Sequence, residues 1–76
     1  MSTEFRWGIL ASGGIAQAFA RDLSYFNNHI VAAVGSRSQE SADAFATEFP
    51  GCVAYGSYED LVNDPTLDAI YVATPH

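Results

Sequence analysis

The stretch FRWGILASGGIA, residues 5–16, decides the fold of this chain. Its first part, Phe5 to Ala11, is a short and mostly apolar run that stops near a glycine pair, which is typical of a buried strand. From Ile15 onward the apolar residues recur at helical spacing, which predicts an amphipathic helix. The apolar face of this helix is expected to carry Ile15, Phe19, Leu23 and Phe26. A strand that passes through a glycine turn into a helix predicts a β-α unit.

The rest of the chain repeats this alternation of strand and helix. Apolar runs at residues 29–34, 52–55 and 69–73 predict three more strands. Ser38 and Ser57 are suitable N-caps for two intervening helices. The apolar face of the first of these helices is expected to carry Ala42, Phe45, Ala46 and Phe49. Because such strands pair in parallel through right-handed crossovers, we expect an α/β fold, a partial Rossmann fold with strand order 3-2-1-4 and flanking helices.

The composition narrows the classes of protein to which the chain can belong. Hydrophobic residues make up 49% of its 76 residues and charged residues 16%, which is typical of a folded protein. Three arginines against nine acids give a formal charge of −6, so we expect no binding to nucleic acid or to anionic membranes. The sequence lacks an apolar run of the ~20 residues that span a bilayer and lacks the pattern of a signal peptide. We therefore expect a cytoplasmic protein.

The length of the chain makes a complete enzyme improbable, and its cysteine, two of its arginines and His29 are interpreted as structural or solvated residues. A chain of 76 residues buries only about 60% of its unfolded surface, which leaves little core for a cofactor site and a substrate pocket together. The single cysteine, Cys52, cannot form an intramolecular disulfide and is interpreted as a small apolar residue. Arg6 and Arg21 are interpreted as solvated residues of little energetic weight, and His29 as an ordinary residue at the start of a strand.

The turn after the first predicted strand has the form of a nucleotide-binding loop. Compared with the pattern G-x-G-x-x-G/A, Gly13 fills the second glycine position, Ala16 fills the third, and Ala11 replaces the first. Gly14 adds backbone freedom beside the helix N-terminus, where unpaired N–H groups and the helix dipole attract an anion. By itself this turn is equally typical of a tightly packed helix. The strands around it favour a dinucleotide site.

The end of the second predicted strand, where a dinucleotide site contacts the ribose, carries Ser36, Arg37 and Ser38. A site that prefers NAD places an acid there, whereas a hydroxyl, a guanidinium and a serine at a helix start suit the 2′-phosphate of NADP. A solvated arginine beside a capping serine is the alternative. Residues 74–76 follow the fourth predicted strand, and the expected strand order places them beside the glycine turn.

Four stretches of the chain together resemble the start of the GFO/IDH/MocA oxidoreductases. They are RWGILASGGIA (residues 6–16), VGSRS (34–38), AYGSYEDL (54–61) and DAIYVATPH (68–76). The resemblance is closest to the branch of dihydrodiol and xylose dehydrogenases that use NADP. It implies three groups of cofactor-binding residues. The first group is the glycine turn, Ala11, Ser12, Gly13, Gly14 and Ile15, of which the last three would offer backbone contacts to the pyrophosphate. The second group would hold the 2′-phosphate and consists of Ser36, Arg37 and Ser38. The third group would line the ribose and nicotinamide and consists of Thr74, Pro75 and His76.

The resemblance also implies a longer protein. In the family, the nucleotide-binding domain continues with a Glu-Lys-Pro segment whose lysine is catalytic, and a second α/β domain supplies the substrate pocket. We therefore expect residues 1–76 to be the N-terminal part of a dinucleotide-binding domain, without the catalytic C-terminal domain and without a catalytic residue of its own. The implied function is NADP binding for an oxidoreductase that transfers a hydride between NADP and a sugar, polyol or diol.

Two other functions stay open on the sequence alone. A non-catalytic half-Rossmann module would bind a nucleotide or pair with another chain, and a structural fragment would bind no ligand. The fourth predicted strand leaves an apolar sheet edge without a neighbour, which invites association with another chain, including a second copy.

Overall fold

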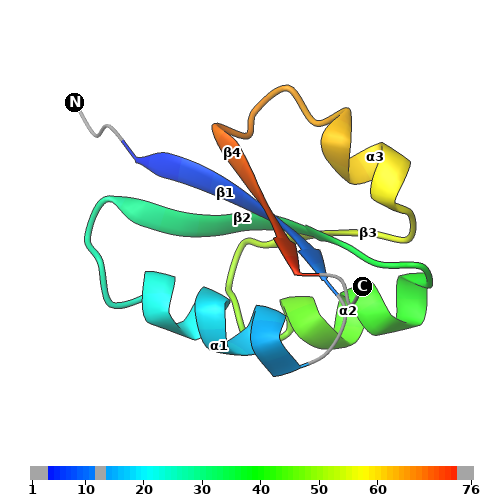
Figure 1. The fold of residues 1–76 in the computed structure, drawn as a ribbon, viewed down its shortest axis with the longest axis horizontal. Helices are drawn as coiled ribbons and strands as arrows, with labels where there is room; N and C mark the ends of the chain where they lie inside the picture. Colours follow the sequence, from blue (N-terminus) through cyan, green and yellow to red (C-terminus); the bar gives the residue numbers. More distant parts are fainter. Residues whose placement is uncertain (1–3, 12–13, 74–76) are drawn as a thin grey trace.

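The computed structural model describes residues 4–11 and 14–73, and these form a parallel sheet with helices on both faces (Figure 1). The four strands of this part of the chain lie in the order β3-β2-β1-β4. Their bounds are β1 (Phe5–Ala11), β2 (His29–Gly35), β3 (Val53–Tyr55) and β4 (Ala69–Ala73). This arrangement confirms the α/β fold and the strand order expected from the sequence.

The helices cover the two faces of the sheet unequally. In Figure 1, α1 (Gly14–Leu23) and α2 (Gln39–Ala46) lie on one face, and α3 (Tyr58–Val62) lies on the other. Ser38 and Ser57 are N-caps, as predicted, because each hydroxyl accepts a backbone N–H of its own first turn at 3.1 Å. Among the helices of residues 14–73, the longest is α1 with 10 residues, and none is long and apolar enough to cross a membrane.

The main core lies between the sheet and the helices α1 and α2. Alanines on these helices are fully buried against branched strand residues, and their short side chains let the helices approach the sheet closely. The buried members of this core are Ile9, Ala16, Ala20, Leu23, Val31, Val34, Ala42, Phe45 and Phe49.

The opposite face of the sheet is packed around Leu61 of α3, whose side chain is fully buried. This helix lies close to β2 because Gly35 has no side chain: a Cβ there would lie 2.7 Å from the Leu61 Cβ. Gly8 on β1 makes room in the same way, with Leu67 Cδ1 at 2.5 Å from the position of a Cβ. Gly35 therefore allows α3 to lie close to the sheet, and Gly8 makes room for the ends of the Leu67 and Leu61 side chains.

Two helix ends differ from the prediction. Helix α1 ends at Leu23, because the following turns use tighter bonds, from Tyr25 N–H to Asp22 O (3.2 Å) and from Phe26 N–H to Leu23 O (3.0 Å). Phe26 consequently leaves the apolar face and is 60% exposed, so its predicted place in the core was wrong. Phe49 is buried as predicted, but it lies beyond the end of α2.

The interpretation of Arg6 as a solvated residue was also wrong. Its side chain is half-buried, and its Nε donates to the Thr66 carbonyl at 3.0 Å. Its backbone N–H donates to Asp68 Oδ2 at 2.7 Å, and its carbonyl accepts the Asp68 N–H at 2.7 Å. Arg6 therefore fixes the segment that leads into β4 against the start of β1.

Candidate cofactor-binding site

Three strands end at one edge of the sheet, and this edge is the candidate cofactor-binding site. Ala11 at the end of β1 is paired with Ala73 of β4, and the preceding residue Leu10 is paired with Gly35 at the end of β2. The chain passes from β1 to β2 on one side, whereas β3 is followed by β4 on the other side of β1 (Figure 1). Strand order therefore reverses between β1 and β4, which is where open parallel sheets bind ligands.

Of the predicted pyrophosphate residues, the structure describes the backbone of Ala11, Gly14 and Ile15, and it lies at this edge. Ala11 is the last residue of β1, and Gly14 and Ile15 open α1. The N-terminus of α1 thus lies at the switch point of the sheet, where a helix dipole favours an anion. The predicted residues that lie outside the described ranges are Ser12, Gly13, Thr74, Pro75 and His76.

The predicted 2′-phosphate residues form the connection between β2 and α2. Ser36 is half-buried, and its backbone N–H donates to the Tyr55 carbonyl at 3.1 Å. Ser38 uses its hydroxyl within α2, since Oγ accepts the Ser41 N–H at 3.1 Å and donates to Ser41 Oγ at 2.9 Å. Arg37 between them is exposed. The connection thus carries an exposed arginine directly after a half-buried serine, while Ser38 serves as a helix cap.

The other two arginines are engaged elsewhere. Arg21 forms an ion pair with Glu48 at 3.0 Å, and its Nη2 donates to the other carboxylate oxygen at 3.0 Å. The hydrogen bond from Arg21 lowers the pKa of the Glu48 carboxyl. Within the described ranges, no hydrogen bond or ion pair engages the Arg37 guanidinium. Arg37 is therefore the arginine for which the described residues show exposure and no such contact.

Gln39, which the sequence reasoning did not single out, supports this connection. Its Nε2 donates to Asp43 Oδ1 at 2.9 Å and to the Ala54 carbonyl of β3 at 3.0 Å. The spacing of four residues could have indicated the first bond. The second bond joins residues 15 apart and depends on the pairing of β2 with β3, for which the local sequence has no signal.

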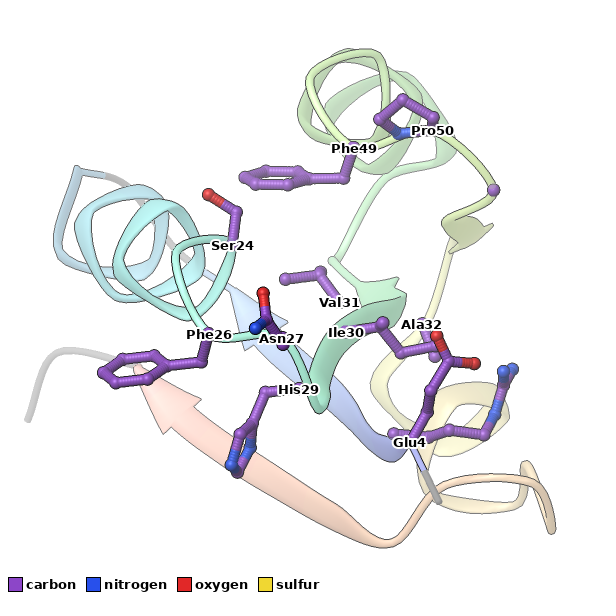
Figure 2. Close-up of a pocket in the computed structure, with 12 residues that line it drawn as sticks. Glu4, Ser24, Phe26, Asn27, His29, Ile30, Val31, Ala32, Phe49 and Pro50 are labelled. Atoms are coloured by element: carbon purple, nitrogen blue, oxygen red, sulfur yellow. The ribbon is translucent and has the colours of Figure 1, made fainter. Parts of the chain in front are cut away.

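A separate groove of about 610 Å³ lies at the opposite end of the sheet. Figure 2 shows Phe26 from the α1–β2 connection, His29 from the start of β2 and Phe49 from the α2–β3 connection around it. His29 Nδ1 accepts the indole N–H of Trp7 at 2.9 Å, which agrees with its interpretation as a structural residue. The groove lies at the amino-terminal ends of the strands, so it is distinct from the candidate site.

The sequence pattern of one protein family matches residues 5–76, and that family is described as an oxidoreductase family with an NAD-binding Rossmann fold. The chain belongs to this family, the GFO/IDH/MocA oxidoreductases. This match confirms the resemblance found in the sequence. It also agrees with the strand order and with the position of the glycine turn between β1 and α1.

Two curated relatives confirm the branch of the family. The chain is 41% identical over 83 aligned residues to the D-xylose 1-dehydrogenase (NADP(+)) of Hypocrea jecorina, with 93% of this chain and 21% of the relative covered. It is 44% identical over 73 residues to the trans-1,2-dihydrobenzene-1,2-diol dehydrogenase of Mus musculus, with 93% and 22% covered. The chain thus spans about a fifth of the length of each relative.

Solved structures of dehydrogenases and reductases share the fold. A 3-ketoreductase from Actinomadura kijaniata in complex with NADP superposes with a TM-score of 0.86 and 29% identity, over 95% of this chain and 23% of that one. The myo-inositol dehydrogenase from Lactobacillus casei in complex with NAD(H) and myo-inositol gives 0.83 and 25%, over 93% and 22%.

Proposed function

We propose that this chain binds the adenosine-phosphate half of NADP in an oxidoreductase that transfers a hydride between NADP and a sugar, polyol or diol. The observation that supports it most directly is the exposed Arg37 at the carboxyl end of β2, next to the switch point of the sheet. The bound dinucleotide would supply the hydride chemistry, and the residues of this chain would hold and orient it.

The β2–α2 connection fits a 2′-phosphate better than a free ribose hydroxyl. A guanidinium can donate two parallel hydrogen bonds to phosphate oxygens, and Arg37 is accessible for this. The half-buried Ser36 offers a further hydroxyl donor, and residues 36–38 contain no carboxylate that would repel the phosphate. The Ser38 cap would hold the first turn of α2 in place behind them.

The contacts to the pyrophosphate, ribose and nicotinamide are proposed from the positions of their residues in the sequence relative to β1, α1 and β4. Ala11, Ser12, Gly13, Gly14 and Ile15 would face the pyrophosphate between β1 and α1, because this turn joins the strand and helix that open the fold. Thr74, Pro75 and His76 follow β4, the strand paired with β1, and would line the ribose and nicotinamide.

The substrate class rests on the relatives. The names of the fungal and mouse relatives specify a sugar and a diol, and the bacterial myo-inositol dehydrogenase acts on a polyol. Because the chain spans about a fifth of these proteins, we propose that residues 1–76 are the N-terminal part of a dinucleotide-binding domain and that a separate domain carries out catalysis. A cytoplasmic location, which we expect from the sequence, is part of this proposal.

A second candidate function is a non-catalytic module that pairs with another chain through the edge of the sheet. Its support is β4, which has no strand neighbour on its outer side within residues 4–11 and 14–73, and whose Val72 is 62% exposed. Edge strands of this kind template pairing with other chains, so a homo-oligomer formed through β4 belongs to this proposal.

The test of the NADP proposal is a nuclear magnetic resonance titration of the 76-residue chain with NADPH and with NADH. We expect tighter binding of NADPH, with amide shifts centred on residues 36–38. Arg37→Gln should weaken NADPH binding by roughly ten- to a hundredfold, because charge-assisted hydrogen bonds are lost, and should leave NADH binding nearly unchanged.

Arg21→Gln is the matched control, since it removes the same charge from an ion pair away from the site. It should preserve the preference for NADPH. Equal affinity for NADPH and NADH, or an Arg37→Asp variant that binds NADPH as the wild type does, would falsify the assignment.

A further inference from the structure

The Gln39 side chain joins the start of α2 to the end of the sheet. Its amide nitrogen donates to Asp43 Oδ1 at 2.9 Å and to the Ala54 carbonyl at 3.0 Å. Because both partners are acceptors, the –NH2 end must face them. The amide oxygen then lies over Gly56, where a Cβ would approach Gln39 Oε1 to 2.9 Å. The orientation of the amide is therefore determined by its surroundings.

The residues on both sides of Arg37 are hydrogen-bonded to β3. On one side, the Ser36 N–H donates to the Tyr55 carbonyl at 3.1 Å. On the other side, Gln39 donates to the carbonyl of Ala54, the adjacent residue of β3. The connection between β2 and α2 is thus anchored at both ends to consecutive carbonyls of one short strand.

No other side-chain bond within the described ranges ties this connection to the sheet. The Ser38 hydroxyl bonds only to Ser41, so the cap stabilises α2 without fixing its position relative to β3. The Asp43 partner of Gln39 also lies within α2. The bond from Gln39 to Ala54 is the one that holds the first turn of the helix against the strand.

We propose that Gln39 is a positioning residue for recognition of the 2′-phosphate, and that it acts by anchoring the segment of Arg37 to β3. This inference rests on the proposed NADP function. Holding the backbone on both sides of Arg37 lowers the conformational freedom that the guanidinium would otherwise lose on binding. Gln39 itself contacts β3 and α2, and its effect on the ligand passes through Arg37.

The experiment compares two ligands that differ only in the 2′-phosphate, adenosine 2′,5′-bisphosphate and adenosine 5′-monophosphate. Their affinities for the 76-residue chain are measured by titration monitored by nuclear magnetic resonance. Gln39→Met keeps the length of the side chain and removes the donor. We expect it to reduce the preference for the bisphosphate by roughly two- to tenfold, the range expected for one net hydrogen bond.

Asp43→Ala is the matched control, because it removes the helical partner of Gln39 and keeps the bond to Ala54. It should preserve the preference for the bisphosphate. Gly56→Ala gives a second variant, since the added methyl group would lie 2.9 Å from Gln39 Oε1 and 3.2 Å from Gln39 Cα and would displace Gln39 without changing its chemistry. It should reduce the preference in the same direction as Gln39→Met, and circular dichroism verifies that each variant is folded.

The outcomes separate the positioning role from the cofactor proposal. If the wild type prefers the bisphosphate and Gln39→Met retains that preference, the positioning role is wrong and the NADP proposal stands. An equal loss of affinity for both ligands, or the same reduction of preference in Asp43→Ala, assigns Gln39 a purely structural role and also overturns it. If the wild type has no preference for the bisphosphate, the NADP proposal fails and the positioning role fails with it.

Discussion

Single residues of this acidic chain show why Arg37 is the candidate anion-binding group. Arg6 is half-buried and donates to the Thr66 carbonyl, and Arg21 is paired with Glu48. Both guanidinium groups are thus used to hold segments of the chain together. Arg37 is exposed at the end of β2, where the position in the sheet, and not the charge alone, makes it suitable for a phosphate.

At the same scale, Cys52 should be unreactive in the folded chain. Burial raises the pKa of its thiol from about 9 to about 11, so at pH 8 the thiolate fraction is about a hundredfold lower than in the unfolded chain. Alkylation by iodoacetamide at pH 8 should therefore be about a hundredfold slower in buffer than in concentrated urea. Equal rates in the two solvents would show that the thiol is not buried.

The raised pKa of Cys52 also has a consequence for stability. Between pH 9 and pH 11 the unfolded chain loses the thiol proton while the folded chain keeps it, so this contribution to stability is complete below pH 9 and is lost as the pH rises through about 11. Cys52→Ala should reduce the loss of thermal stability over this range. The hydrogen bond to Asp64, which raises the pKa of Tyr55, contributes a loss with the same sign.

At the scale of elements, the packing of α3 on the sheet depends on two strand glycines that differ in what surrounds them. A Cβ at Gly35 would meet the Leu61 Cβ at 2.7 Å and the Ser57 carbonyl at 3.2 Å, so the helix backbone would have to move. A Cβ at Gly8 would meet the ends of the flexible Leu67 and Leu61 side chains at 2.5 and 3.2 Å. A methyl group at Gly8 therefore requires smaller adjustments.

We expect Gly35→Ala to destabilise the chain by about 1–3 kcal/mol, the usual cost of overpacking, and Gly8→Ala to destabilise it less. For a domain of this size each kcal/mol lowers the thermal midpoint by about 4–8 °C. Thermal unfolding followed by circular dichroism measures both variants. The packing argument is wrong if Gly8→Ala lowers the midpoint as much as Gly35→Ala.

Most elements could be predicted because their signals are local. Serine caps and apolar runs identified the strands and the starts of α2 and α3 within a residue or two. The end of α1 could not be predicted, because the sequence keeps its apolar spacing to Phe26 while the backbone tightens after Leu23. Contacts across the fold were also missed, such as Gln39 with Ala54, because they depend on strand pairing.

For the candidate site, the sequence predicted the position of the residues in the fold but not their contacts. The sequence placed residues 36–38 at the end of a strand, and the structure confirms that position. It did not indicate that Ser38 would be occupied as a cap or that β3 would anchor the segment, since both follow from three-dimensional contacts. The roles of the glycine turn and of residues 74–76 stay predictions.

At the scale of the whole molecule, two features of the surface oppose each other. The formal charge of −6 repels a second copy, and this repulsion is long-range and screened by salt. The outer edge of β4 favours association, since Val72 is 62% exposed and the strand has no outer neighbour among the described residues. Antiparallel pairing of β4 with β4 of a second copy about a two-fold axis would give hydrogen-bond partners to the outer backbone N–H and C=O groups of both strands.

We therefore expect the 76-residue chain to form a dimer in sedimentation equilibrium, and to form it more readily at high salt. Val72→Lys should leave the chain monomeric, because a lysine on an edge strand disfavours pairing. Val62→Lys on α3 is the matched control: Val62 is 52% exposed, and the substitution changes the net charge by the same amount.

Because each lysine lowers the net negative charge, charge repulsion alone would make both variants dimerise more tightly. Loss of the dimer in Val72→Lys but not in Val62→Lys would therefore identify the β4 edge as the interface, whereas a wild-type chain that is monomeric at millimolar concentration and high salt would exclude it.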